Sequence, residues 1–159
     1  MNTSGELTEG LMKPLYEFSD FVRRLRVQAR FGRLSRAPLQ LLRLELRGDA
    51  AECEWMARPP DHWDTDLPAP LRERNAASQA LEDAIAVRDL LFSTLPSLSR
   101  AVFRVFRRAE DGSVELIITG TVTRDEEIPV RVASLAMRAK LSGFRFWLDN
   151  GQLRELQLE

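Results

Sequence analysis

Apolar residues recur along the first part of the chain at intervals of three and four, the spacing of a helix with one apolar face. This stripe consists of Leu11, Leu15, Phe18, Val22, Leu25 and Ala29. Pro14 is expected in the first turn, where its missing N–H costs no hydrogen bond. A second helical pattern runs from Leu71 to Leu95 and includes Ala77, Ala80, Leu81, Ala84, Ile85, Leu91 and Phe92. The sequence therefore predicts two amphipathic helices.

Each predicted helix is followed by a segment in which apolar and polar residues alternate. Residues 42–55 alternate on both sides of Gly48–Asp49, and residues 101–122 alternate on both sides of Asp111–Gly112. A period of two is typical of half-buried strands, and a glycine next to an aspartate favours a tight turn. Two β-hairpins are therefore predicted. In the second one, Val114, Leu116, Ile118 and Val122 are expected to share one face.

A third, shorter unit follows. The spacing of Val130, Ala133, Met137 and Leu141 predicts a helix, and Gly143 is expected to end it. Alternation then resumes over residues 144–148 and 153–158, which predicts a third strand pair.

The loop of that last strand pair can have two or three residues. With a three-residue loop at Asp149–Gly151, Trp147 lies opposite Leu153 and Arg145 opposite Glu155. A two-residue loop would instead set Phe146 against Glu155. Cross-strand neighbours of matching polarity stabilise a sheet, so the longer loop is favoured.

The tetrapeptide LSRA stands between helix and strands in the first two units, at residues 34–37 and 98–101. The chain thus predicts three helix–strand–strand units at about 11–58, 68–124 and 129–158. They are expected to form a single α+β domain over residues 11–159, after a flexible lead-in at 1–10. Six strands joined mainly as hairpins favour an antiparallel sheet with the helices on one face. Residues 113–150 resemble the small helix–strand–strand modules of the BON family in pattern, and no function is inferred from that likeness.

Composition places the chain among ordinary soluble proteins. Its 159 residues are 44% hydrophobic and 30% charged, and its net charge of −1 makes no general case for binding nucleic acid. No run of apolar residues is long enough for a membrane span. The opening MNTSGELTEG carries two glutamates and no basic residue, unlike a secretory signal, so a cytoplasmic location is expected.

Charge is unevenly distributed along the chain. Residues 11–47 carry a local charge of +6 and residues 48–90 a local charge of −6. The two segments are expected to neutralise one another, within the fold or across an oligomer interface. The arginine-rich stretch 21–37 is a candidate surface for an anionic partner or nucleic acid through Arg23, Arg24, Arg26 and Arg30. The favoured alternative is the solvent-exposed face of a helix.

The stretch RPPDHWDTDLPAP at 58–70 holds the chain's one histidine, His62, close to Asp61, Asp64 and Asp66. Calcium loops need an interior glycine and a distal glutamate, and zinc needs further histidine or cysteine ligands, so no metal site is predicted. DTDLP at 64–68 matches DEEIP at 125–129, and each precedes a predicted helix. Asp66 or its neighbours are therefore expected to cap the second helix.

No catalytic constellation and no cofactor-binding motif is found in the sequence. Cys53 is the lone cysteine and is expected to be a small core residue. The favoured function is a non-enzymatic protein-interaction or assembly module that forms a homodimer through a sheet edge or the open sheet face. Ile117 and Trp147 are the candidate contact residues on that face, together with Val102.

Two other functions stay open. One is a ligand-binding protein or enzyme with a pocket between sheet and helices. The other is a binder of nucleic acid or of another anionic partner through the arginine-rich first helix. No membrane partner is expected.

Overall fold

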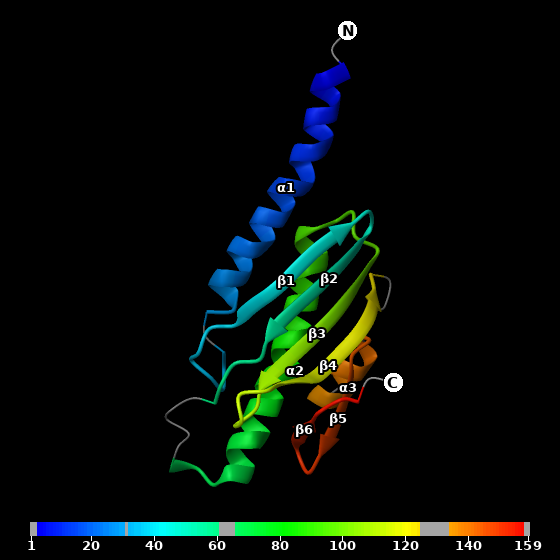
Figure 1. Ribbon diagram of the computed structural model, residues 1–159. Coiled ribbons are helices and arrows are strands. Elements are labelled where there is room, and N and C mark those ends of the chain that lie inside the picture. The colour runs from blue at the N-terminus through cyan, green and yellow to red at the C-terminus, as the bar shows by residue number, and fades with distance from the viewer. Residues whose placement is uncertain (1–2, 31, 61–65, 125–133, 158–159) are drawn as a thin grey trace.

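The computed structural model describes residues 3–30, 32–60, 66–124 and 134–157, and it describes side chains from Tyr16 onward. The described residues form helices and a mostly antiparallel sheet, which confirms an α+β fold (Figure 1). The elements are α1 (Thr3–Gln28), β1 (Gln40–Arg47), β2 (Ala50–Met56), α2 (Ala69–Thr94), β3 (Arg100–Arg108), β4 (Val114–Thr123), α3 (Leu135–Leu141), β5 (Arg145–Asp149) and β6 (Gln152–Arg154).

The strands form one mostly antiparallel sheet in the order β1-β2-β3-β4-β5-β6. The predicted strand pairs β1–β2, β3–β4 and β5–β6 are confirmed as antiparallel. The expectation of a fully antiparallel sheet is wrong, because β2 and β3 run parallel, with Cys53 opposite Phe103. Between them α2 carries the chain back along the whole length of the sheet, and such a crossover connection makes neighbouring strands parallel.

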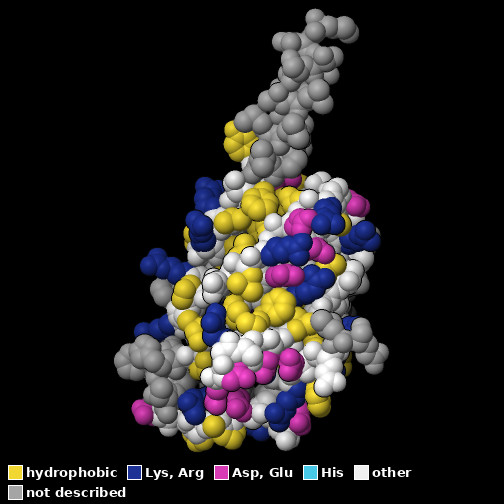
Figure 2. Space-filling view, viewed as in Figure 1, with side chains coloured by type: hydrophobic (Ala, Val, Ile, Leu, Met, Phe, Trp, Pro, Cys, Tyr) yellow, Lys and Arg dark blue, Asp and Glu magenta, His cyan; other side chains and the backbone are white. Residues whose placement is uncertain are grey.

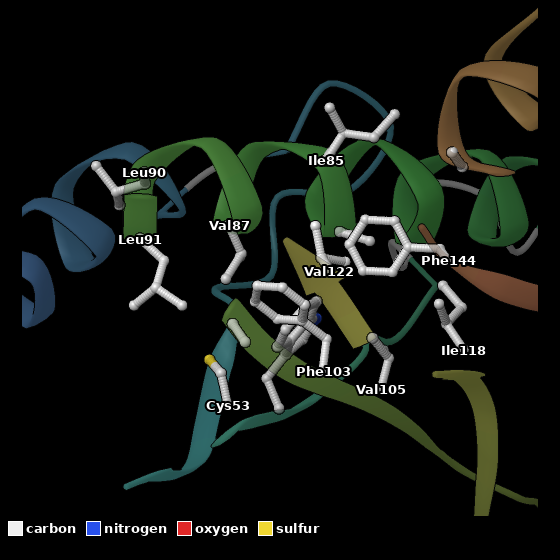
Figure 3. Close-up of a cluster of buried hydrophobic side chains, with 14 of the residues drawn as sticks. Cys53, Ile85, Val87, Leu90, Leu91, Phe103, Val105, Ile118, Val122 and Phe144 are labelled. Carbon is white, nitrogen blue, oxygen red and sulfur yellow. The ribbon is translucent and has the colours of Figure 1, made fainter. Parts of the chain in front are cut away.

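The core lies between α2 and one face of the sheet. In Figure 3 the side chains of Val87 and Leu91 on α2 point toward Phe103 and Val105 on β3, whereas Ile85 points away from the sheet. All five belong to one buried cluster. The helix predicted at 71–95 is confirmed, and its apolar face is the main partner of the sheet.

Helix α1 packs beside α2 and extends beyond the rest of the fold (Figure 1). Phe21 and Leu25 are buried against the core, whereas Val22 and Ala29 of the predicted stripe are only partly buried. The helix begins at Thr3, within the lead-in expected at 1–10. The placement of Pro14 in a first turn is therefore wrong: it lies inside the helix, where it cannot donate to the carbonyl of Gly10.

Helix α3 is shorter than predicted. Ser134 caps it by accepting a hydrogen bond from the N–H of Met137, and Gly143 follows its end with φ of 100°. Met137 and Leu141 are exposed while Ala139 is buried, so the predicted apolar stripe is wrong for this helix. The other two stripe residues, Val130 and Ala133, lie outside the described residues.

A glycine on β4 lets the chain after α3 pack closely on the sheet. A Cβ placed on Gly120 would lie 2.4 Å from the carbonyl oxygen of Gly143. Any larger residue at 120 would therefore push the end of α3 away from the sheet.

The loop between β5 and β6 has two residues, and the favoured three-residue loop is wrong. Trp147 lies opposite Arg154, and Leu148 lies opposite Leu153. Asn150 and Gly151 have φ of 52° and 78°, the positive values that a tight type I′ hairpin turn requires. The backbone preference of Asn–Gly thus outweighs the side-chain pairing on which the longer loop rested.

Candidate interaction surface

The sheet face opposite α2 is open. Figure 2 views this face and shows hydrophobic side chains around a central group of arginines and acidic residues. The strand register places Arg43, Glu54 and Arg104 in one row across β1, β2 and β3. Met56 and Phe106 lie opposite each other in the next row, toward the other end of the strands.

Six charged residues of the open face form a network of ion pairs: Arg43, Arg47, Arg104, Glu45, Glu52 and Glu54. Arg104 lies 3.0 Å from Glu54, Arg43 lies 3.1 Å from Glu52, and Arg47 lies 2.7 Å from Glu45. Arg43 also contacts Glu45, and hydrogen bonds from Arg43 and then Arg47 lower the pKa of Glu45. Exposed ion pairs add little stability. Three arginines match three glutamates within this network, and Arg145 adds a further positive charge on the same face.

Apolar side chains stand beside this network. Phe106 and Val102 are half-buried, and Trp147 on β5 is 56% exposed. The register sets Arg145 opposite Thr119, and Trp147 lies two residues further along β5, on the same side. The predicted exposure of Trp147 is therefore confirmed. A half-exposed tryptophan on a sheet face is a typical contact residue.

Ile117 is not on the open face, and the expectation that it is exposed is wrong. Val105 pairs with Ile118 while Phe106 pairs with Leu116, so Ile117 is an extra residue at a β-bulge. A bulge interrupts the alternation of side chains between the two faces. Ile117 and Ile118 therefore both belong to the core, and Ile117 is only 1% exposed. The same bulge separates Leu116 from Ile118, which were expected to share a face.

The arginines of α1 are largely neutralised by nearby acids. Asp20 lies 2.6 Å from Arg23 and 3.0 Å from Arg24, and the hydrogen bond from Arg23 is the main cause of its lowered pKa. Arg26 and Arg30 are exposed at the end of the helix. As predicted, the basic and acidic segments meet, because Arg33 lies 2.6 Å from Glu82 and Arg43 contacts Glu52.

An open depression of about 560 Å³ lies between α1 and the end of α2. Tyr16, Asp20, Arg23 and Thr94 are among its lining residues. Asp20 and Arg23 already pair with each other there. The depression is a shallow surface feature rather than the deep polar pocket that an enzyme between sheet and helices would need.

Asp66 does not form the expected cap of α2. The residue that precedes the helix is Pro68, which makes no side-chain capping hydrogen bond, and Asp66 is exposed. The prediction that Asp66 caps this helix is therefore wrong. Its neighbours Asp61, His62 and Asp64 lie outside the described residues, as does the stretch 125–129.

A buried polar cluster joins β2, α2 and the loop before β1, and sequence reasoning missed it. Arg58 donates from Nε and Nη2 to both carboxylate oxygens of Asp83, at 2.8 and 3.2 Å, and from Nη1 to the carbonyl of Ala37. Gln79 donates to Asp83 and accepts from the N–H of Leu34. These bonds hold the loop against α2, which is a structural role. The available signal was the position of Asp83 among the apolar residues of the second helix.

Cys53 is fully buried in the core, as predicted, and burial raises the pKa of its thiol to about 12. The thiolate is the reactive form of cysteine. We expect a thiol reagent at pH 8 to modify the native protein at least ~10³-fold more slowly than the unfolded chain. Labelling in buffer and in denaturant, followed by mass spectrometry, measures this ratio. Comparable rates would show that Cys53 is accessible.

Comparison with protein-family models, with curated proteins and with solved structures gives no match. Among the described residues, no helix is long and apolar enough to cross a membrane. Nor do those residues contain a group of three or more histidine, cysteine, aspartate or glutamate side chains that could hold a metal ion.

Proposed function

We propose that the chain is a non-enzymatic protein-interaction module that forms a homodimer through the open face of its sheet. The observation that carries this proposal is the exposed Trp147 on a sheet face that none of the described helices covers. Half-buried apolar residues and a balanced ion-pair network share that face. An apolar patch with a polar surround is typical of a protein interface.

The dimer is favoured over a partner of another kind because the network at the centre of the face contains charges of both signs. Its three arginines and three glutamates can each lie opposite residues of the other sign in a second copy. The enzyme alternative gains no support from the shallow depression at α1. The nucleic-acid alternative is weakened because Asp20 and Glu82 pair with three of the arginines.

The test is a single charge placed at the centre of the proposed contact. We expect the protein to sediment as a dimer at micromolar concentrations, and Trp147→Glu to shift it to monomer. A loss of about 2 kcal/mol at such a contact weakens the dimer about thirtyfold. Analytical ultracentrifugation over a dilution series measures it.

The matched control is Leu71→Glu, on α2. Leu71 is 45% exposed, so the change in polarity and exposure is similar while the open face stays intact. We expect this variant to remain a dimer. A monomeric parent protein, or a dimer that Trp147→Glu leaves unchanged, would contradict the proposal.

A further inference from the structure

Strand β1 forms one edge of the sheet. Among the described residues it pairs with β2 alone, and β6 lies at the opposite edge. An edge strand offers unpaired backbone N–H and C=O groups to another extended segment. Leu42 is the extra residue of a β-bulge, so the regular part of this edge is the stretch 43–47.

The hairpin turn fixes which groups face outward. A two-residue loop at Gly48–Asp49 joins Arg47 to Ala50, and residues that flank such a loop exchange both backbone hydrogen bonds. The backbone groups of 43, 45 and 47 therefore point toward β2. Those of Leu44 and Leu46 point away from the sheet and are the ones that can bind an added strand.

Partly buried apolar side chains lie on the core side of this edge. Leu44 and Leu46 point to the core side but are only partly buried, as are Val22 and Ala29 of α1. In Figure 1 α1 runs beside β1, on the side away from β2. Because α1 packs against α2, it belongs to the helix layer and leaves the edge in the sheet layer open. An added strand would lie next to β1 with alternate side chains directed toward α1.

Charged and apolar side chains alternate along this edge. Along Arg43-Leu44-Glu45-Leu46-Arg47, two arginines flank a glutamate on the open face, with leucines between them. The best-matched strand has an acid opposite each arginine, a residue without negative charge opposite Glu45, and apolar residues between. Residues 155–159 of this chain, Glu-Leu-Gln-Leu-Glu, have this pattern. Both stretches place like residues symmetrically about their centres, so parallel and antiparallel addition give the same charge pairs.

We propose that the β1 edge of one copy binds residues 155–159 of a second copy as an added strand. The contact must be between copies, because β1 and β6 are at opposite edges of the same sheet. In its own chain, Leu156 donates its N–H to the carbonyl of Leu116, a hydrogen bond that the segment exchanges for those of the edge. This inference rests on the proposed self-association and adds a second contact to it.

The experiment is a titration of the whole protein with a fluorescein-labelled peptide of residues 152–159, QLRELQLE, which equals β1 in length. The control peptide carries lysine in place of Glu155 and Glu159. We expect the natural peptide to bind about tenfold more tightly, since two attractive pairs become repulsive. With Arg47→Glu protein the preference is expected to disappear, because each peptide then meets one attractive and one repulsive partner. Arg100→Glu, on β3, is the matched control and should keep the preference.

The outcomes separate this inference from the open-face dimer. Trp147→Glu protein should bind the natural peptide as the parent does. A dimer that binds the natural peptide and that Trp147→Glu leaves unchanged would overturn the open-face contact alone. A parent protein that sediments as a monomer would overturn both contacts. A dimer that does not bind the peptide, or that binds both peptides equally, would overturn the β1 edge contact alone.

Discussion

Replacing Asp83 by alanine is expected to cost about 3–5 kcal/mol of unfolding free energy, because it leaves Arg58 buried without its counterion. The Arg58 side chain is nearly inaccessible and donates to both oxygens of this carboxylate. Gln79 loses a hydrogen-bond acceptor in the same variant. Urea denaturation monitored by far-UV circular dichroism measures the loss.

An exposed ion pair that involves the same helix provides the control. Glu82 lies 2.6 Å from Arg33, and the Arg33 side chain is 66% exposed. Glu82→Ala is expected to cost at most about 1 kcal/mol, since exposed ion pairs contribute little. Equal losses of unfolding free energy for the two variants would show that the buried pair contributes no more to stability than the exposed pair.

The double variant Arg58→Met/Asp83→Leu distinguishes a stabilising pair from one that only positions the loop. Burial raises the pKa of Asp83 even though hydrogen bonds and charge attraction from Arg58 act in the opposite direction. The desolvation cost thus outweighs the attraction at this carboxylate. We expect the double variant to lie within about 1–2 kcal/mol of the parent protein, much closer than either single variant.

The hairpins could be predicted because they depend on neighbouring residues only. Alternation identified the strands of β1–β2 and β3–β4, and the glycines at 48 and 112 adopt φ of 59° and 86°, which their turns require. The same locality explains the β5–β6 error. There the turn residues Asn150 and Gly151 decided the register, and side-chain matching across the strands was the weaker guide.

The parallel pair β2–β3 could not be predicted from local pattern. The alternation in β2 and β3 is the same whether the strands run parallel or antiparallel. The decision comes from α2, which is long enough to return the chain to the end of the sheet where β2 begins. Which strand lies next to which is a property of the packed sheet rather than of any one segment.

The depth of burial within α1 also depended on tertiary packing. Helical spacing predicted an apolar stripe, and two of its members, Leu25 and Val22, do face inward. Phe21 is buried more completely than either, although it was assigned to the arginine-rich stretch. Because α2 lies beside α1, the buried side of α1 is shifted by one residue from the predicted stripe. The sequence of a single helix does not show where its neighbour lies.

Of the two candidate contact residues on the open face, the sequence placed Trp147 correctly and Ile117 wrongly. Trp147 lies on a regular strand, where alternation assigns it correctly to the open face. Ile117 is the extra residue of a β-bulge, and a bulge cannot be recognised from the sequence within an apolar run such as Leu116–Ile118. The acidic cluster before α2 misled because capping needs a geometry that composition does not specify.

Ile117→Ala tests the bulge directly, because the two assignments of this residue differ strongly in energy. A buried isoleucine truncated to alanine loses about 2–5 kcal/mol, through lost transfer energy and the cavity left behind. On an exposed strand face the same change costs within about 0.5 kcal/mol. Ile117 is 1% exposed and packs in the core cluster, so we expect the larger loss in urea denaturation.

Val114→Ala is the matched control, since Val114 lies on the same strand and is 52% exposed. It is expected to change unfolding free energy by no more than about 0.5 kcal/mol. A small loss for both variants would place Ile117 back on the open face. A regular β4 would then direct Ile118 to the opposite side from Ile117, and Ile117 would again join Trp147 as a contact residue. A large loss at 117 alone leaves Trp147 as the residue on which the open-face dimer depends.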